Sequence, residues 1–222
     1  MIDHKIQLAL GASLQAFSKY SGIEVNQMHQ EFKAVFERED NFLTKVQALD
    51  EVFNNHPQLE VLREVFFDML MINFFSADVK KLEEDYLDSA EWEDIEEQTL
   101  DRGTELLNLL LYLNECEDED IESELDDYLK EFLLVDDDEF QDEYRIYEPV
   151  IAHQVLMESP LEEIAKVAEK LPEDSELKEL FYPMMCFFQN PNPTTVEKNT
   201  IAAKAINKGF DMAVFSILES FI

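Results

Sequence analysis

Two dense runs of carboxylates are the residues of this chain whose types and spacing are best suited to chemistry. The first run is Glu117, Asp118, Glu119 and Asp120, and the second is Asp136, Asp137, Asp138 and Glu139. Side chains of this kind attract cations and basic protein surfaces, and they repel nucleic acids and anionic membranes. We therefore take these acids as candidate residues for binding a basic protein partner.

Neither run has the spacing that a metal site requires. A calcium loop needs glycine in its sixth position and glutamate in its twelfth, whereas a loop starting at Asp118 would place Ser123 and Leu129 there. A loop starting at Asp136 fails in the same way. None of the histidines follows a glutamate by three residues, as carboxylate-bridged iron sites require, and no two histidines lie at the helical spacing of zinc sites. We therefore expect no metal and no other cofactor.

Histidine and cysteine offer no recognisable catalytic group. His153 lies five residues after Glu148, so the two share no helix face and the carboxylate is not placed to orient the imidazole. Cys186 has no basic neighbour in the sequence, and Cys116 is equally isolated, so we expect two buried, reduced thiols, with a disulfide between them as the alternative. The chain also lacks a phosphate-binding loop and a nucleophile elbow. We predict no catalytic residue, and an enzyme whose pocket combines distant residues stays an alternative.

Trp92 lies among acids, in Glu91-Trp92-Glu93-Asp94. An exposed tryptophan in such a setting would be a strong anchor for a partner. Its helical spacing from Ile95 and Thr99 fits packing against the core equally well and is more often seen in that role. We keep Trp92 among the candidate partner-binding residues, with core packing as the simpler interpretation.

The acids are concentrated in the middle of the chain, which has 222 residues and a net charge of −34. Residues 77–148 hold 29 of the 51 acidic residues but only 5 of the 17 lysines and arginines. Acids that served solubility alone would be spread evenly, so this concentration favours a directed role. Apolar residues recur every three to four positions among the acids, and this predicts an ordered, acidic helical segment over residues 77–148.

Helical spacing of apolar residues extends along nearly the whole chain. The clearest stripes are Ile6, Leu10, Leu14 and Phe17 near the start, and Phe210, Val214, Ile217 and Phe221 near the end. We predict an all-α fold, a multi-helix bundle of about ten helices in a single domain over 1–222. Residues 161–180 resemble the join between two solenoid helix pairs, so solenoid-like helix pairs in the C-terminal third stay an alternative.

Helix boundaries are marked by capping residues and prolines. Ser159 and Glu162 fit a capping box, and so do Thr194 and Glu197. Between these two helix starts, prolines and asparagines predict a loop over 189–195. Pro183 is expected to bend or end the helix that it interrupts.

The apolar clusters are too short for a membrane helix, which needs about 20 residues. The longest lie within residues 65–72 and 106–113, and polar residues interrupt both. The first residues, Met1-Ile2-Asp3-His4-Lys5, also lack the basic and apolar pattern of a secretory signal. We therefore expect a cytoplasmic protein that does not bind membranes.

Three functions fit these observations, and each predicts a different surface. An interaction or adaptor protein that binds a basic protein partner, which we favour, predicts acids around an apolar groove. A nucleic-acid mimic that inhibits a DNA-binding protein predicts carboxylates at phosphate-like intervals along one surface. An enzyme predicts a deep cleft with a buried glutamate or histidine of shifted pKa. None of the three involves direct binding of nucleic acid.

Overall fold

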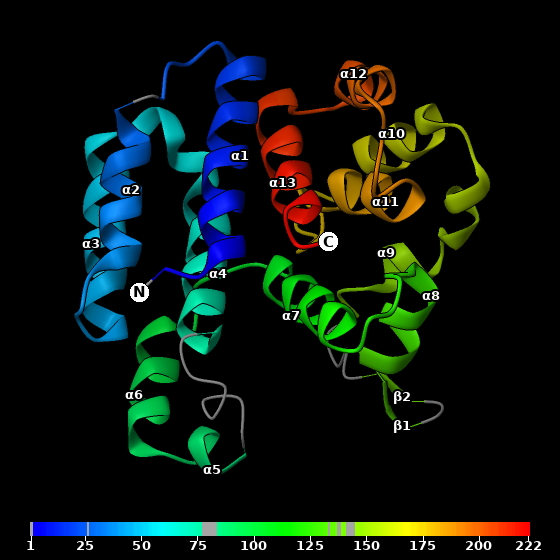
Figure 1. The fold of residues 1–222 in the computed structure, drawn as a ribbon. Coiled ribbons are helices and arrows are strands. Elements are labelled where there is room, and N and C mark those ends of the chain that lie inside the picture. Colours follow the sequence, from blue (N-terminus) through cyan, green and yellow to red (C-terminus); the bar gives the residue numbers. More distant parts are fainter. Residues whose placement is uncertain (1, 26, 77–83, 133, 137–138, 141–144) are drawn as a thin grey trace.

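Helices dominate the computed structural model, as the spacing of apolar residues predicts (Figure 1). The structure describes residues 2–25, 27–76, 84–132, 134–136, 139–140 and 145–222. Up to residue 118 its helices are α1 (His4–Ser21), α2 (Met28–Glu37), α3 (Phe42–Asn55), η1 (Pro57–Leu62), α4 (Arg63–Ser76), α5 (Glu84–Leu87), α6 (Ala90–Thr99) and α7 (Leu106–Asp118). The prediction of an all-α fold is confirmed.

The remainder of the chain adds shorter elements. They are α8 (Leu125–Asp127), η3 (Tyr128–Phe132), β1 (Leu134–Asp136), β2 (Glu139–Phe140), α9 (Glu148–Ile151), η4 (Gln154–Glu158), α10 (Leu161–Lys170), α11 (Phe181–Gln189), α12 (Thr195–Lys204) and α13 (Lys208–Glu219). Here η1 and η4 are 3₁₀ helices and η3 is a single π-helical turn.

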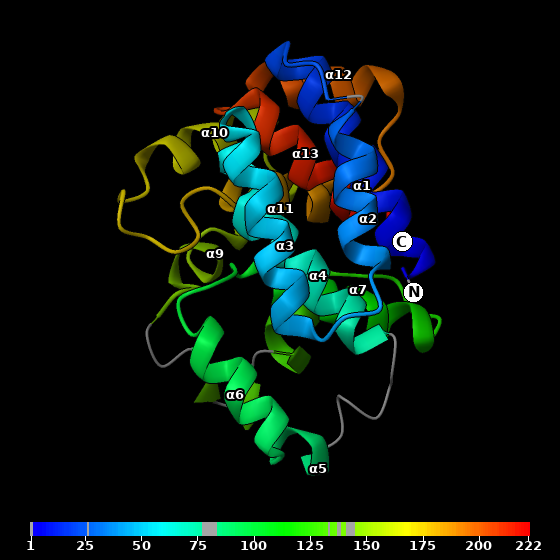
Figure 2. The same ribbon diagram turned by 90° about the vertical axis from the view of Figure 1, so that its left-hand side faces the viewer.

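Helix α1 lies at the centre of the fold because one side of it is apolar along its whole length. Asp3 caps its start by accepting hydrogen bonds from the backbone N–H groups of Lys5 and Ile6. Gly22, at φ 78°, ends it in the left-handed conformation that glycine adopts readily. Figures 1 and 2 show α13 alongside α1, and α4 is a further neighbour.

The start of α1 and the last residues of the chain lie close together beside α7 (Figure 2). Phe221 is buried, and its carbonyl oxygen accepts a hydrogen bond from Lys5 Nζ at 3.3 Å. The buried apolar residues from Ile6 to Phe221 form one continuous core cluster. That continuity supports a bundle in which the C-terminal helices share the core of α1 and do not stack as a separate solenoid.

Within the acidic segment over residues 77–148, which we predicted to be helical, a short antiparallel pair of strands lies around Phe140. Leu134 lies opposite Phe140 in this pair, with an irregular step before Asp136. A run of successive aspartates is unfavourable in a helix, whereas Leu134 and Val135 suit a strand. The helical prediction for residues 77–148 therefore holds for α6 and α7 but is wrong at β1 and β2. Residues 77–83, 133, 137–138 and 141–144 lie outside the described residues.

The two predicted capping boxes have different outcomes. The Thr194 box is present, because Thr194 and Glu197 exchange hydrogen bonds at the start of α12. The Ser159 box is wrong, since Ser159 Oγ donates to the carbonyl of Val155 and Pro160 occupies the capping position of α10. In the same region, Pro183 does not break a helix but lies in the first turn of α11, where a missing N–H is tolerated.

Candidate functional site

The last turn of α7 carries four exposed carboxylates, those of Glu115, Glu117, Asp118 and Glu119. No basic residue lies in this turn. The C-terminal end of a helix carries partial negative charge, so acids there repel both the helix dipole and one another. The turn is therefore an unfavourable place for these side chains unless a cation neutralises them.

The chain leaves α7 through a tight backbone motif centred on Asp120. Asp120 has a φ of 57°, and its N–H donates to the carbonyl of Glu117 at 3.1 Å. The N–H of Ile121 reaches back to the carbonyl of Cys116 at 2.9 Å. This pair of hydrogen bonds is a Schellman motif, which usually has glycine at the left-handed position. It turns the chain sharply after Glu119 and leaves the last turn of α7 open to solvent.

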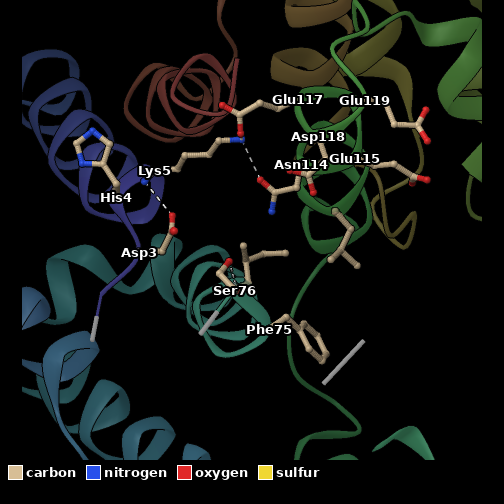
Figure 3. Close-up of a pocket in the computed structure, with 12 residues that line it drawn as sticks. Asp3, His4, Lys5, Phe75, Ser76, Asn114, Glu115, Glu117, Asp118 and Glu119 are labelled. Atoms are coloured by element: carbon tan, nitrogen blue, oxygen red, sulfur yellow. Dashed lines mark hydrogen bonds and ion pairs between the residues drawn. The ribbon is translucent and has the colours of Figure 1, made fainter. Parts of the chain in front are cut away.

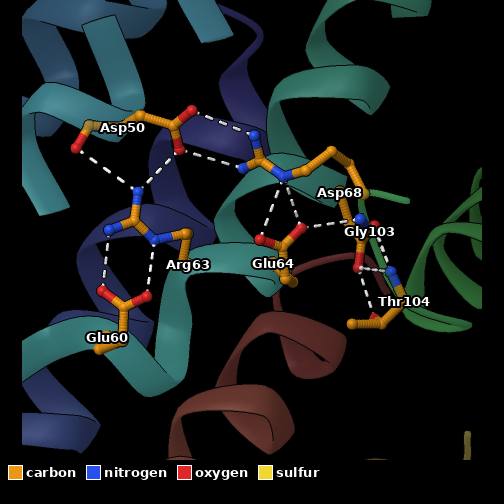
Figure 4. A network of polar contacts seen from close by, with 8 residues as sticks. Asp50, Glu60, Arg63, Glu64, Asp68, Gly103 and Thr104 are labelled. Carbon is orange, nitrogen blue, oxygen red and sulfur yellow. Dashed lines mark hydrogen bonds and ion pairs between the residues drawn. The ribbon is translucent and has the colours of Figure 1, made fainter. Parts of the chain in front are cut away.

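A network of half-buried charges, with the exposed Glu60 at its edge, holds the loop before α7 against α3 and α4 (Figure 4). The Arg102 guanidinium donates to both oxygens of Asp50 at 3.1 Å and to Glu64 at 2.9 Å. Asp50 also accepts from Arg63 at 2.8 Å, and Arg63 in turn binds Glu60. The network therefore joins two helices to the loop that leads into α7.

The adjoining backbone of this loop is fixed by Asp68, whose side chain is fully buried. Its carboxylate accepts hydrogen bonds from the N–H and the hydroxyl of Thr104, at 3.0 Å and 2.5 Å. Burial raises the pKa of Asp68 well above its usual value, while the hydrogen bonds from Thr104 act in the opposite direction. Gly103 packs so closely that a Cβ built on it would lie 2.7 Å from Asp68 Oδ1.

Below the acids lies a cavity of about 770 Å³ between the start of α1, the end of α4 and the end of α7 (Figure 3). We call it the acidic groove. Its lining residues are Asp3, His4, Lys5, Ile72, Phe75, Ser76, Leu111, Asn114, Glu115, Glu117, Asp118 and Glu119. Ile72, Phe75 and Leu111 supply its apolar surface, and the carboxylates of α7 supply its acidic rim. The groove thus combines an apolar floor with a negative edge.

Lys5 shows how this surface receives a cation. Its ammonium forms an ion pair with Glu117 and hydrogen bonds with Asn114 Oδ1 at 3.1 Å and the Phe221 carbonyl at 3.3 Å. In Figure 3 Glu117 points toward Lys5, whereas the carboxylates of Glu115 and Glu119 point away from it. Within the described part of the chain, no side chain forms an ion pair with Glu115, Asp118 or Glu119.

A second cavity, of about 390 Å³, lies on the other side of Glu117. It is lined by Leu113, Cys116, Glu117, Asp120, Ile121, Glu122, Ser123, Pro191, Asn192, Phe221 and Ile222. It too combines apolar residues with acids, and it includes part of the predicted loop over 189–195. Because Glu117 lines both cavities, the end of α7 stands between them.

The structure separates the two predicted acidic runs. Glu117, Asp118 and Glu119 line the acidic groove, and Asp120 lines the second cavity. Asp136 and Glu139 belong to the β1–β2 pair, which packs on η3. Asp137 and Asp138 lie outside the described residues. The first run of predicted acids thus lines the two cavities described above.

Trp92 is half-buried and packs against the core. Its ring lies 5.5 Å from that of Phe75, measured between centroids, and 6.2 Å from that of Tyr86. Phe75 is part of the groove floor, so Trp92 supports the floor from α6 and is absent from the residues that line the groove. The simpler interpretation, core packing, agrees with this position.

The residues that sequence analysis missed come from the start of α1 and the end of α4. Asp3 and Lys5 are more than a hundred positions from the acids of α7, and Phe75 lies about 40 positions before them. No local pattern links such distant segments. The capping pattern of Asp3 fixes where α1 begins, but it does not indicate that α7 packs beside it.

Three further titratable residues, Asp211, Cys186 and His153, line neither cavity. Burial raises the pKa of Asp211 to about 7, and its carboxylate accepts hydrogen bonds from the N–H groups of Ile206 and Asn207. Burial likewise raises the pKa of Cys186 to about 12, so its thiol is not a reactive nucleophile. His153 Nδ1 lies 2.7 Å from the Pro149 carbonyl, as expected for a satisfied histidine.

Among the described residues, no group of three or more histidines, cysteines, aspartates or glutamates has the geometry of a metal site. None of the helices in this part of the chain combines the length and the apolar character that spanning a membrane requires. No family model, curated protein or solved structure matches the chain.

Proposed function

We propose that this is a non-enzymatic interaction protein that binds a basic segment of a partner protein in the acidic groove. The observation that carries the proposal is the combination of an apolar floor, formed by Ile72, Phe75 and Leu111, with a rim of exposed carboxylates. Apolar side chains of a partner would provide most of the affinity, and its lysines or arginines would provide orientation and speed of association.

Lys5 supports this proposal because its ammonium already occupies one end of the acidic rim. It pairs with Glu117 and leaves Glu115, Asp118 and Glu119 for other cations. A partner lysine or arginine would meet the same kind of oxygen ligands that Lys5 meets. The charge of residues 77–148 would attract such a partner over a distance of about one screening length, roughly 8 Å at physiological salt.

The position of the acids in the last turn of α7 gives a second supporting argument. A cation bound there would reduce the repulsion among the carboxylates and with the helix dipole. Binding should therefore stabilise the protein as well as occupy the groove. The two buried thiols, which are free in the structure, are compatible with a reducing compartment and support the proposal of a cytoplasmic protein.

The alternatives receive less support. A nucleic-acid mimic would need its carboxylates along one surface, whereas the two acidic runs belong to separate elements and the first surrounds apolar side chains. An enzyme would need a buried carboxylate of shifted pKa in a cleft, whereas Asp68 and Asp211 line neither cavity and accept hydrogen bonds from the backbone.

The test is the affinity of the protein for a short peptide of alternating lysine and leucine residues, measured by titration calorimetry. A variant with Glu115→Gln, Asp118→Asn and Glu119→Gln should bind this peptide roughly tenfold more weakly, because exposed ion pairs contribute about 0.2–1 kcal/mol each. A peptide of alternating lysine and serine should bind more weakly to the wild-type protein, since it leaves the groove floor uncovered.

A matched control removes the same charge elsewhere. Glu158, Asp174 and Glu176 are exposed acids that line neither cavity. The variant Glu158→Gln, Asp174→Asn, Glu176→Gln should bind the lysine–leucine peptide nearly as well as the wild type. Equal losses in both variants would mean that net charge alone attracts the peptide, and the groove would then not be its binding site.

A further inference from the structure

The same two turns of α7 form a wall of both cavities. Leu111, Asn114 and Asp118 lie on the side that faces the acidic groove. Leu113, Cys116 and Asp120 lie on the side that faces the second cavity. Each set is spaced by three or four residues, as expected for one face of a helix. The two cavities are therefore adjacent surfaces on opposite sides of one helix end.

The two cavities resemble each other in chemistry. The floor of the second cavity includes Leu113 and Phe221, and acids at Asp120 and Glu122 accompany it. Ile222, which is 50% exposed, adds an apolar side chain at its edge. A ligand that suits the acidic groove, with apolar and basic side chains, suits the second cavity for the same reasons.

Lys5 lines the acidic groove and contacts two residues of the second cavity, Glu117 and Phe221. Lys5 has its three ammonium hydrogens matched by three acceptors, on Asn114, Glu117 and Phe221. Glu117 remains 61% exposed, whereas the Lys5 side chain is only 18% exposed. An ion pair with one partner so exposed is weak, so another cation can compete with Lys5 for Glu117.

We infer that the two cavities act as one binding surface for a single basic segment that crosses the end of α7 and places one apolar side chain in each cavity. This inference rests on the proposed function. In the free protein the Lys5 ammonium pairs with Glu117, where the two cavities meet. When the partner binds, one of its basic residues replaces Lys5 at Glu117, so Lys5 is an internal occupant of this position. The partner is thus a protein segment with two separated apolar anchors and lysine or arginine between them.

The inference is tested with the alternating lysine–leucine peptide and one variant in each cavity. Leu111→Gln changes the floor of the acidic groove, and Ile222→Ser changes the edge of the second cavity. Both side chains are partly exposed, so both variants should fold. A melting temperature close to that of the wild type would verify this for each variant. Each variant should weaken the binding of the peptide about tenfold, as expected for one lost apolar contact in a pocket.

The outcomes separate this inference from the proposed function. Loss of affinity in Leu111→Gln alone would overturn the inference and leave the acidic groove as a single site. Unchanged affinity in both variants would count against the groove itself. The affinity of a lysine peptide with a single leucine should fall in only one of the two variants, or by a smaller factor in each. A tenfold loss of affinity for this peptide in both variants would contradict separate anchor sites.

Lys5 is tested by its own pair of variants. Lys5→Gln frees Glu117 and should raise the affinity for the peptide several-fold, because a peptide lysine no longer competes with an internal one. Lys5→Arg keeps the ion pair and should leave the affinity close to that of the wild type. A weaker affinity in Lys5→Gln, with an unchanged melting temperature, would overturn the role of Lys5 as an internal occupant.

Discussion

At the scale of single residues, Asp120 has two roles, one through its carboxylate and one through its backbone, and only the first was predictable from the sequence. Its carboxylate was predictable as part of an acidic run, and it lines the second cavity. Its backbone, however, takes the left-handed position of a Schellman motif, which aspartate adopts less easily than glycine. Lys5 shows the same limit of prediction, since its basic side chain was visible but its pairing with Glu117 depends on a contact between distant segments.

The backbone role of Asp120 predicts a stabilising substitution. Asp120→Gly should raise the free energy of unfolding by about 0.5–1 kcal/mol, because glycine relieves the left-handed strain and removes a charge near the end of α7. Asp120→Ala removes the same charge but keeps the strain, so it serves as the control. Chemical denaturation measures both variants, and equal stability of the two would refute the backbone argument.

At the scale of elements, the sequence predicts the long helices but does not predict how they pack against one another. The stripes of α1 and α13 are long and continuous, so their apolar spacing was sufficient. The end of the acidic segment was less predictable. Successive aspartates and residues that favour strands lie there, and the chain forms β1 and β2 in place of a helix. The acidic groove depends on how α1, α4 and α7 pack together, and that packing follows from contacts that no local pattern contains.

Gly103 tests the connection that places α7. Gly103→Ala should lower the free energy of unfolding by about 1–3 kcal/mol, since its φ of 87° disfavours other residues and the new Cβ would lie 2.7 Å from Asp68 Oδ1. Gly22→Ala is the matched control, because Gly22 has a similar φ of 78° but no atom within 4 Å of the added Cβ. A Gly103 variant no less stable than the Gly22 variant would contradict the close packing on Asp68.

At the scale of the whole molecule, the net charge of −34 opposes folding through repulsion among the acids. The sequence predicts this repulsion and its concentration in residues 77–148. It does not predict that four carboxylates of α7 would line a cavity, because the cavity needs side chains from positions 3–5, 72–76 and 111–119. Charge density is a local property of the sequence, whereas a groove is a property of the fold.

Stability should therefore rise on mild acidification. Asp211 has a pKa of about 7 in the folded protein against an ordinary value of 3.8, so the folded state binds its proton more tightly than the unfolded state. Its contribution to stability is complete below pH 3.8 and is lost as the pH rises through about 7, by up to about 1.4 kcal/mol per pH unit. The raised pKa of Asp68 acts in the same direction.

The measurement is the free energy of unfolding between pH 5 and pH 8, in low salt and in about 0.15 M salt, where the screening length is about 8 Å. Stability should fall as the pH rises, and salt should raise it at the upper end of this range. Asp211→Asn should have a shallower pH dependence than the wild type. A stability that increases with pH, or a melting temperature that salt leaves unchanged, would contradict crowding of the acids.

The most direct test of the central claim is hydrogen exchange of the wild-type protein with and without the lysine–leucine peptide. If the peptide binds in the acidic groove, exchange should slow in residues 114–121, at the last turn of α7 and its Schellman motif, and at the start of α1. The acidic residues of the β1–β2 pair should show little change. Protection confined to β1 and β2, or none at the end of α7, would contradict the proposal that the acidic groove binds basic partners.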